Sequence, residues 1–213
     1  MAAEKDSSGW WASPVDYLTF AQMQDNAKLC WSFLGSQGWT LNAVAGALGN
    51  FQAESTLNPA IWQGRTVPAD PYTTSKGYGL AQWTPANKYI NWCDSKGISY
   101  PLGSSNMTYL VAEPEHKGNW STNNYKNYTW SEYIVATDPP EICARCWLWG
   151  YERPASPNLT DRQKKARYWY DYLEGVSPEP PTPPSPWPGD WLLYVVANRK
   201  RGRYAGKPRL KFF

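Results

Sequence analysis

Glu54 is the residue whose position in this sequence best suits acid catalysis. It follows residues 40–53, which predict an amphipathic helix in which Gly46 and Gly49 permit close packing. Apolar neighbours and the negative end of a helix dipole both favour the protonated form of a carboxylic acid. Cleavage of a glycosidic bond near neutral pH needs such an acid. We therefore interpret Glu54 as a candidate glycosidase acid; the alternative is a solvated carboxylate at a helix end.

A glycine-flanked aromatic segment, residues 77–83, predicts a sugar-binding wall beside this acid. Gln82 offers an amide to sugar hydroxyls, and Tyr78 and Trp83 offer aromatic planes to sugar rings. Glycines in a strand mark either a bulge or a close approach of a ligand to the backbone. A hairpin that buries Trp83 in the core fits the same pattern, so both interpretations stay open. Residues 55–83 as a whole predict loops and a small sheet of two or three strands.

The second group that a glycosidase needs is less clearly marked. A carboxylate near the acid serves as nucleophile in retaining enzymes and as base in inverting ones. Asp70 lies between Glu54 and residues 77–83 and is our candidate for this catalytic carboxylate, although an Asp before Pro71 is also an ordinary turn residue. Without a facing carboxylate, the acetamido or 6-hydroxyl group of the sugar could act instead. The 6-hydroxyl route gives the anhydro product of a lytic transglycosylase.

A further cluster follows the predicted helix at residues 140–151. Glu152 and Arg153 are an adjacent acid and base before Pro154, and such a pair more often anchors a helix end than performs catalysis. Tyr151, beside them, is a candidate substrate-binding residue that could line the cleft.

The remaining pattern predicts a mainly α protein with a small β component. Apolar periodicity predicts helices over residues 23–37, 40–53, 84–97, 105–113, 129–136, 140–151 and 160–175. Thr84 and Pro85 should begin the third of these helices. Thr160 and Gln163 should form a capping box for the last one.

The chain divides into four predicted segments. These are an N-terminal extension (1–21), a globular domain (22–175), a proline-rich linker (176–189) and a basic C-terminal segment (190–213). Seven of the 19 prolines fall within the linker, which predicts an extended polyproline II spacer. The last segment joins a short apolar stretch to a basic tail, and we expect a partner protein to hold it by adding a strand.

Composition limits the partners that this chain can have. It carries 21 Lys and Arg against 18 Asp and Glu, but seven of the basic residues follow Asp190, so the rest is acidic and a poor nucleic-acid binder. No apolar run is long enough to predict a membrane span, and the polar N-terminus lacks the apolar core of a secretory signal. The 14 Trp exceed what the core needs, so we expect several aromatic side chains to be exposed to a ligand.

Cysteine and histidine usage predicts no metal site and no cofactor. The single His116 and the CxxC pair at residues 143–146 do not complete a convincing ligand set. We expect the four cysteines to be buried free thiols: Cys30, Cys93, Cys143 and Cys146.

Three blocks of this sequence resemble the phage tail lysozymes, best represented by the peptidoglycan-degrading domain at the tail tip of small podoviruses of Gram-positive hosts. The blocks are WTLNAVAGALGNFQAESTLNPAIWQ (39–63), GYGLAQWTPANKYINW (77–92) and YERPASPN (151–158), and the resemblance runs from about residue 23 to residue 173. It implies a lysozyme-like fold with Glu54, the glutamate of the QAES block, as the acid. The implied reaction is hydrolysis of the β-1,4 bond between N-acetylmuramic acid and N-acetylglucosamine. The family representative continues into a peptidase domain, whereas this chain has the spacer and the basic segment.

The resulting hypothesis is a virion-associated muramidase of the phage tail. It would be made in the host cytoplasm, act on bacterial peptidoglycan during infection and be tethered to tail proteins through residues 190–213. One alternative keeps the fold without the chemistry, as a structural or glycan-binding tail protein. Another is a free endolysin that acts at host lysis.

Overall fold

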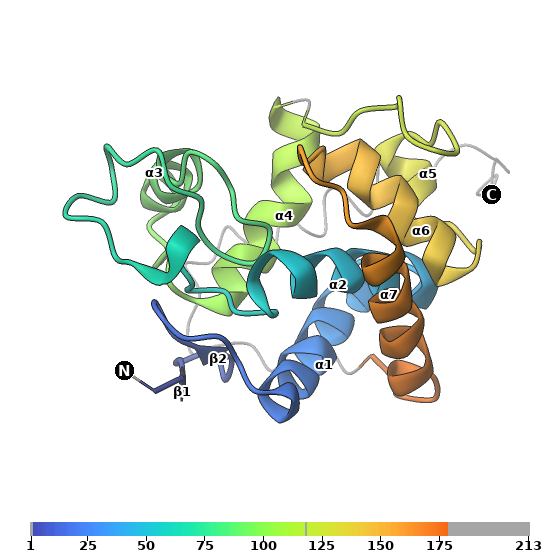
Figure 1. The fold of residues 1–213 in the computed structure, drawn as a ribbon, viewed down its shortest axis with the longest axis horizontal. Helices are drawn as coiled ribbons and strands as arrows, with labels where there is room; N and C mark the ends of the chain where they lie inside the picture. Colours follow the sequence, from blue (N-terminus) through green and yellow to red (C-terminus); the bar gives the residue numbers. More distant parts are fainter. Residues whose placement is uncertain (1, 118, 179–213) are drawn as a thin grey trace, which may run out of the picture. The chain divides into compact units, whose positions relative to one another are not determined.

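A computed structural model describes residues 2–117 and 119–178, apart from the side chains of residues 113–117, and shows a mainly helical protein (Figure 1). The described residues form seven α-helices: α1 (Phe20–Ser36), α2 (Leu41–Ser55), α3 (Asn87–Lys96), α4 (Gly103–Lys117), α5 (Trp130–Ile134), α6 (Pro140–Trp147) and α7 (Leu159–Leu173). A 3₁₀ turn, η1 (Gln63–Arg65), and a π-helical turn, η2 (Leu148–Glu152), are also present. The predicted fold class, mainly α with a small sheet, is confirmed. The basic segment and all but the first three residues of the predicted linker lie outside the described residues.

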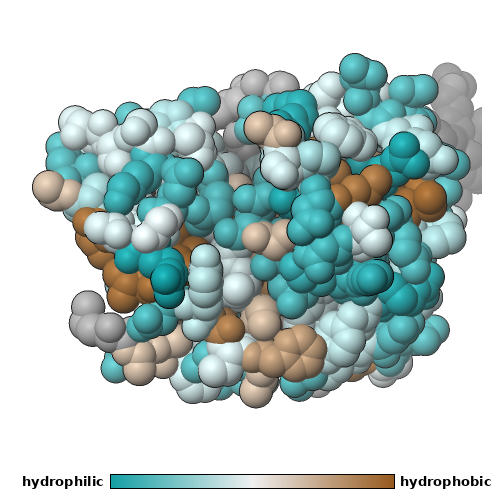
Figure 2. Space-filling model, viewed as in Figure 1, coloured by the Kyte–Doolittle hydropathy of each residue, from teal (hydrophilic) through white to brown (hydrophobic). Residues whose placement is uncertain are grey.

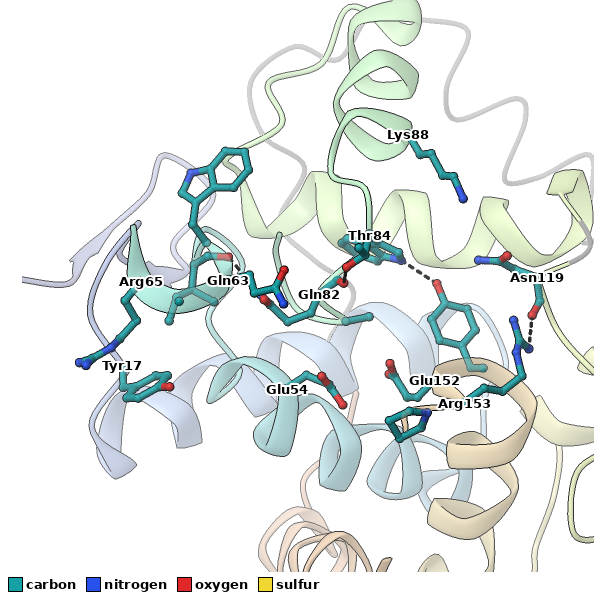
Figure 3. Close-up of a pocket in the computed structure, with 17 residues that line it drawn as sticks. Tyr17, Glu54, Gln63, Arg65, Gln82, Thr84, Lys88, Asn119, Glu152 and Arg153 are labelled. Atoms are coloured by element: carbon teal, nitrogen blue, oxygen red, sulfur yellow. Dashed lines mark hydrogen bonds between the residues drawn. The ribbon is translucent and has the colours of Figure 1, made fainter. Parts of the chain in front are cut away.

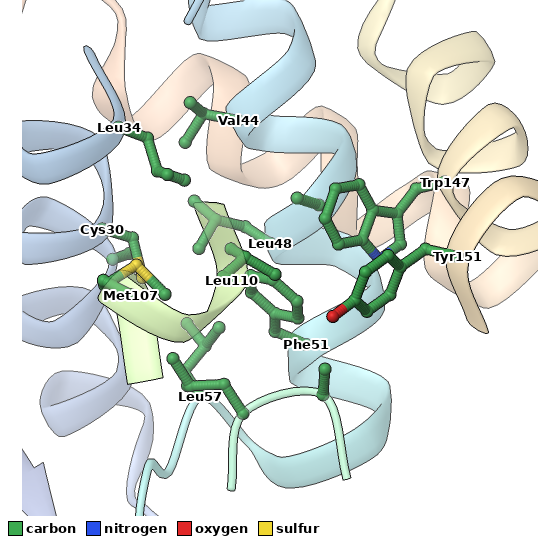
Figure 4. Close-up of a cluster of buried hydrophobic side chains, with 14 of the residues drawn as sticks. Cys30, Leu34, Val44, Leu48, Phe51, Leu57, Met107, Leu110, Trp147 and Tyr151 are labelled. Atoms are coloured by element: carbon green, nitrogen blue, oxygen red, sulfur yellow. The ribbon is translucent and has the colours of Figure 1, made fainter. Parts of the chain in front are cut away.

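Helix α2 is the central element of the described domain. It contacts α1, α5, α6 and α7, and Figure 1 shows it crossing between α1 and α7. Residues 43–51 are all buried, as expected for a helix that other elements surround. Figure 4 shows the core around it, with Cys30, Leu34, Val44, Leu48, Phe51, Leu57, Met107, Leu110, Trp147 and Tyr151.

Two glycines let the neighbouring helices approach α2 closely. A Cβ atom at Gly46 would lie 2.6 Å from Cβ of Cys143 in α6. A Cβ atom at Gly49 would lie 2.5 Å from the main-chain oxygen of Arg162 in α7. Neither position has room for a methyl group, so the predicted close packing is confirmed. It also brings the start of α7 beside the last turns of α2.

Side-chain capping explains why some helix starts agree with the prediction and others do not. Thr40 caps α2 by accepting a hydrogen bond from the main-chain nitrogen of Ala43. Helix α1 starts earlier than predicted because Thr19 and Gln22 form a capping box. Helix α3 starts later than predicted because the hydroxyl of Thr84 donates to the main-chain oxygen of residue 82 instead of capping.

The capping box predicted for α7 is wrong. Asn158 is the N-cap, in the left-handed conformation and without a side-chain cap, so the helix starts one residue before Thr160. Gln163 is used elsewhere, since its Nε2 donates to the main-chain oxygen of Glu141 in α6. The contact between α6 and α7 therefore outweighed the local signal.

The sheet lies elsewhere than predicted. Strands β1 (Glu4–Lys5) and β2 (Trp11–Ala12) pair antiparallel in the N-terminal segment, whereas residues 55–83 hold isolated bridges, turns and η1. Main-chain N–H groups in this region donate to side chains instead of to a neighbouring strand. Gln63 Oε1 accepts from Gly77 N at 2.8 Å, and Asn106 Oδ1 accepts from Leu80 N at 3.0 Å. Those groups are not available for a ladder.

The N-terminal segment joins the helical domain through buried contacts. Trp10 is only 3% exposed and lies against Gly103 at the start of α4. Asp6 Oδ2 accepts a hydrogen bond from the main-chain nitrogen of Gly103 at 2.8 Å. Trp11 exchanges two hydrogen bonds with the side chain of Asn26 in α1. Residues 2–19, which belong to the segment 1–21 that we expected as an N-terminal extension, are thus packed against the helical domain.

The four cysteines are buried and free, as predicted. Burial raises the pKa of Cys143 to about 12 and that of Cys146 to about 11, so both remain neutral thiols at physiological pH. These side chains act in the core as small apolar groups.

None of the helices in the described part of the chain is long and apolar enough to cross a membrane. Figure 2 shows one face of the molecule, where hydrophilic side chains predominate and apolar surface gathers in small separate patches.

Replacing Gly49 by alanine tests the contact between α2 and α7. We expect Gly49→Ala to lower the free energy of unfolding by about 1–3 kcal/mol, because the methyl group must displace the backbone of α7. The helix propensity of alanine offsets only about 1 kcal/mol of this cost. Urea denaturation measures the change, and an unchanged or higher midpoint would show that the two helices are not in tight contact.

Candidate active site

A polar pocket opens beside the C-terminal end of α2 (Figure 3). Its volume is about 670 Å³, which lies in the range of small-ligand sites. Segments far apart in the sequence line it: Tyr17, Glu54, Ile61, Trp62, Gln63, Gly64, Arg65, Ala81, Gln82, Trp83, Thr84, Lys88, Asn119, Tyr151, Glu152, Arg153 and Pro154.

Glu54 lies in the last turn of α2, and its carboxylate reaches this pocket. The helix ends directly after it because Thr56 adopts the left-handed conformation, with φ of 55°. The hydroxyl of Ser55 donates to the main-chain oxygen of Leu80 at 2.9 Å. The end of α2 is thus tied to residues 77–83, which places the acid and the aromatic segment together.

An ion pair holds the carboxylate of Glu54. Arg162 Nη2 donates to Glu54 Oε1 at 2.6 Å, with side-chain exposures of 6% for the arginine and 21% for the glutamate. The same guanidinium donates to Asn50 Oδ1 at 3.2 Å and to the main-chain oxygen of Pro157 at 3.0 Å. The apolar and small neighbours expected from α2 are therefore not the whole environment of Glu54, because α7 brings a cation that the sequence pattern of α2 cannot reveal. Glu54 Oε2 takes no part in this ion pair.

Gln82 lies beside Glu54 with a fixed amide. Its Nε2 donates to the main-chain oxygens of Ile61 and Gly79 at 3.1 and 3.0 Å. Both amide hydrogens are used in this way, which leaves Oε1 as an acceptor at the pocket. Gln82 also has a left-handed backbone, with φ of 47°, at the end of the tight turn between Tyr78 and Trp83. The turn geometry therefore aims the amide.

The aromatic residues of this turn are more deeply buried than a sugar platform would be. Tyr78 is 2% exposed, does not line the pocket, and burial raises the pKa of its phenol well above the ordinary value. Trp83 is 6% exposed and stacks on Tyr89, with ring centroids 4.9 Å apart. Trp83 still lines the pocket, and its Nε1 donates to the hydroxyl of Tyr151 at 2.8 Å. Of the three aromatic residues predicted to bind substrate, the structure thus puts Tyr78 in the core and Trp83 and Tyr151 at the pocket wall.

The two glycines of the segment make room for protein atoms. A Cβ atom at Gly79 would lie 2.5 Å from Asn106 Oδ1, and one at Gly77 would lie 2.8 Å from the main-chain oxygen of Gln82. These contacts favour the core-hairpin interpretation over an approach of ligand to the backbone.

The structure does not bring Asp70 to the pocket. Its carboxylate accepts hydrogen bonds from the main-chain nitrogen of Tyr72 and from the hydroxyl of Thr73, both at 2.9 Å. Asp70 is exposed and closes a local turn, which is the alternative role that a residue before proline suggested.

Glu152 occupies the position in which Asp70 was expected. Figure 3 shows the carboxylates of Glu54 and Glu152 pointing toward one another in the pocket. The π-helical turn η2 presents Glu152, since the main-chain nitrogen of Arg153 donates to the oxygen of Leu148, five residues earlier. Trp147 Nε1 donates to Glu152 Oε1 at 3.0 Å and fixes the carboxylate. Turns of this kind are frequent at functional sites.

Arg153 anchors this end of the helix, as an acid and base before a proline suggested. Its Nη1 donates to the main-chain oxygens of Asn119 and Gly150 at 2.8 and 2.6 Å. Arg65 and Lys88 place further positive charge on the pocket lining. Among residues 2–117 and 119–178, no three or more His, Cys, Asp or Glu side chains gather in a position to hold a metal ion.

Sequence reasoning missed three residues of the site for different reasons. Arg162 looks like any basic residue on an amphipathic helix, and Glu152 looks like half of a local ion pair. Tyr17 lies in a segment without periodicity. Only Glu152 carried a usable signal, because it belongs to the YERP block beside the predicted cleft residue Tyr151.

A helical domain in which the central helix ends in a glutamate that faces a polar pocket is lysozyme-like. Residues 25–173 match the family described as phage tail lysozyme. The chain is also similar to Morphogenesis protein 1 of Bacillus phage B103, with 40% identity over 159 residues, which are 75% of this chain and 42% of that protein. It therefore spans less than half the length of this relative. The chain belongs to the phage tail lysozyme family, which confirms the resemblance.

Removal of the guanidinium tests the ion pair. Arg162→Met should lower the free energy of unfolding by about 3 kcal/mol, because Glu54, Asn50 and the oxygen of Pro157 lose a buried donor. Addition of Glu54→Gln should recover part of the loss, with a coupling of about 1–3 kcal/mol in the double-mutant cycle.

Arg167→Met is the matched control on the same helix. Arg167 pairs with Glu141, but its side chain is 42% exposed, so the loss should stay below about 1 kcal/mol. Equal losses for the two arginine variants would refute a special role for Arg162.

Proposed function

We propose that this chain is a peptidoglycan hydrolase of the muramidase type, with Glu54 as the acid and Glu152 as the second carboxylate. The observation that carries the proposal is the placement of these two carboxylates, from α2 and η2, in one polar pocket (Figure 3). A pair of carboxyl groups flanking the scissile bond is the usual requirement of glycoside hydrolysis. Family membership supports a wall glycan as the substrate.

Glu54 would protonate the leaving oxygen through Oε2, since Oε1 accepts from Arg162. The fixed position of Oε1 limits Oε2 to one direction. Arg162 is thus a positioning residue for Glu54.

Glu152 would stabilise the positive charge that develops at the anomeric carbon. Its carboxylate is oriented by the indole of Trp147, and it faces Glu54 across the space where the scissile bond would lie. Gln82 Oε1 and the wall formed by Trp83 and Tyr151 would orient the sugar. Asp70, which closes a turn outside the pocket, has no part in this scheme.

The biological setting that we propose is the phage particle. The named relative is a morphogenesis protein, which supports a chain that assembles with the virion and opens the wall locally during infection. Residues 190–213 would tether it to a tail protein. The ion pair at Glu54 gives weight to one alternative, a tail protein that binds glycan without cleaving it.

Glu54→Gln should abolish cleavage while leaving the fold intact. The amide oxygen can still accept from Arg162, but the side chain cannot donate an acidic proton, so the rate should fall about 10²–10⁴-fold. New reducing ends released from purified cell walls measure the rate. Asp70→Asn is the control and should retain activity close to that of the unmodified protein.

Glu152→Gln should reduce the same rate at least about 10²-fold, with little change in the affinity for wall glycan. Rates for Glu152→Gln close to the unmodified protein would remove Glu152 from the mechanism.

Wall binding without new reducing ends from the unmodified protein would favour the non-catalytic alternative. If mass analysis of purified phage particles finds that this chain is absent from them, the endolysin alternative would be favoured.

A further inference from the structure

Tyr17 is an exposed aromatic side chain at the edge of the pocket. It is 58% exposed, whereas the other aromatic residues that line the pocket, Trp62, Trp83 and Tyr151, are buried. Figure 3 places Tyr17 and Arg65 on one side of Glu54, and Glu152 on the other. Tyr17 also lies before residues 25–173, the part of the chain that matches the family. The fold thus adds an aromatic ring to the pocket from outside the shared domain.

Hydrogen bonds between side chains near the end of α2 and main-chain groups hold the segment that carries this ring. Asn58 Nδ2 donates to the main-chain oxygens of Ser13 and Asp16 at 2.8 and 2.9 Å. The main-chain nitrogen of Leu18 donates to Thr56 Oγ1 at 3.1 Å. Asn58 and Thr56 directly follow α2, so Tyr17 is fixed relative to the helix end that bears the acid. A main chain held in place before binding loses little freedom when a ligand arrives.

Arg65 gives this edge of the pocket a positive charge. Its guanidinium carbon lies 5.0 Å from the centroid of the Tyr17 ring, in a cation–π contact. Arg65 is exposed and ends η1, and it takes part in no ion pair among the described residues. A guanidinium in that situation can bind a carboxylate with two parallel hydrogen bonds. The two side chains together match a sugar ring that carries a carboxylate.

We propose that Tyr17 and Arg65 form a distal subsite of the pocket for an acidic sugar of the wall glycan. Tyr17 stacks on the pyranose ring, and Arg65 pairs with the free lactyl carboxylate of a muramic acid residue that carries no peptide and is remote from the scissile bond. The subsite rests on the proposed function for the identity of the polymer. It adds to that function a grip on long glycan chains, to which Tyr17 contributes from outside the residues that match the family and Arg65 from within them.

Binding to a protein that cannot cleave tests the subsite directly. In a Glu54→Gln background, the Kd for peptide-free wall glycan should rise about fivefold to tenfold with Tyr17→Ala, the range expected for loss of a stacked ring. Tyr17→Phe should bind like the parent. Arg65→Gln should raise the Kd for wall glycan. Its Kd for neutral chitohexaose, which lacks carboxylates, should stay within about twofold of the parent value.

Tyr125→Ala is the matched control. Tyr125 is 48% exposed and lies 3.8 Å under the guanidinium of Arg145, but it does not line the pocket. Its replacement should leave both Kd values unchanged. Thermal unfolding of each variant checks that the fold is retained.

The outcomes separate the subsite from the hydrolase proposal. Equal Kd values for Tyr17→Ala and its parent, or a parent that binds no glycan, would overturn the subsite. A higher Kd for Tyr17→Ala supports the subsite even if the unmodified chain releases no reducing ends. In that case only the hydrolase proposal fails. If the unmodified chain cleaves, Tyr17→Ala should raise KM on long chains with kcat unchanged, as loss of uniform binding requires.

Discussion

The buried guanidinium of Arg162 connects the stability of this domain to the position of its candidate acid. It joins α7 to the last turns of α2 by binding Asn50 and Glu54 together. A buried charge without a partner is costly, so α7 cannot move away from α2 without stranding it. Gly49 permits this contact, because a side chain there would collide with the main chain of Arg162. The packing of α7 on α2 and the position of Glu54 therefore depend on the same contact.

The same contact defines the electrostatic condition of the site. Glu54 is paired with the buried guanidinium of Arg162 rather than surrounded by apolar side chains alone. Glu152 reaches the same space from a π-helical turn, in which the indole of Trp147 holds its carboxylate. Two carboxylates whose neighbours differ in this way are the arrangement from which unequal roles as acid and charge stabiliser can arise.

The sequence predicted what depends on local periodicity. It placed Glu54 at the end of a helix capped by Thr40, and it found most helices, because apolar spacing and caps act within a few residues. It could not reveal that Arg162 meets Glu54 or that Tyr17 reaches the pocket edge. Those facts depend on contacts between distant segments. Gln163 shows the same limit of sequence-based prediction, because its side chain donates to Glu141 in α6 instead of capping α7.

The most direct test of the account is a crystal structure of the Glu54→Gln protein with a peptide-free wall glycan bound. The account predicts that a glycosidic oxygen lies within hydrogen-bond reach of the residue 54 amide, with the anomeric carbon facing Glu152. A glycan bound away from this pocket, or one whose glycosidic bonds all lie out of reach of residue 54, would contradict it.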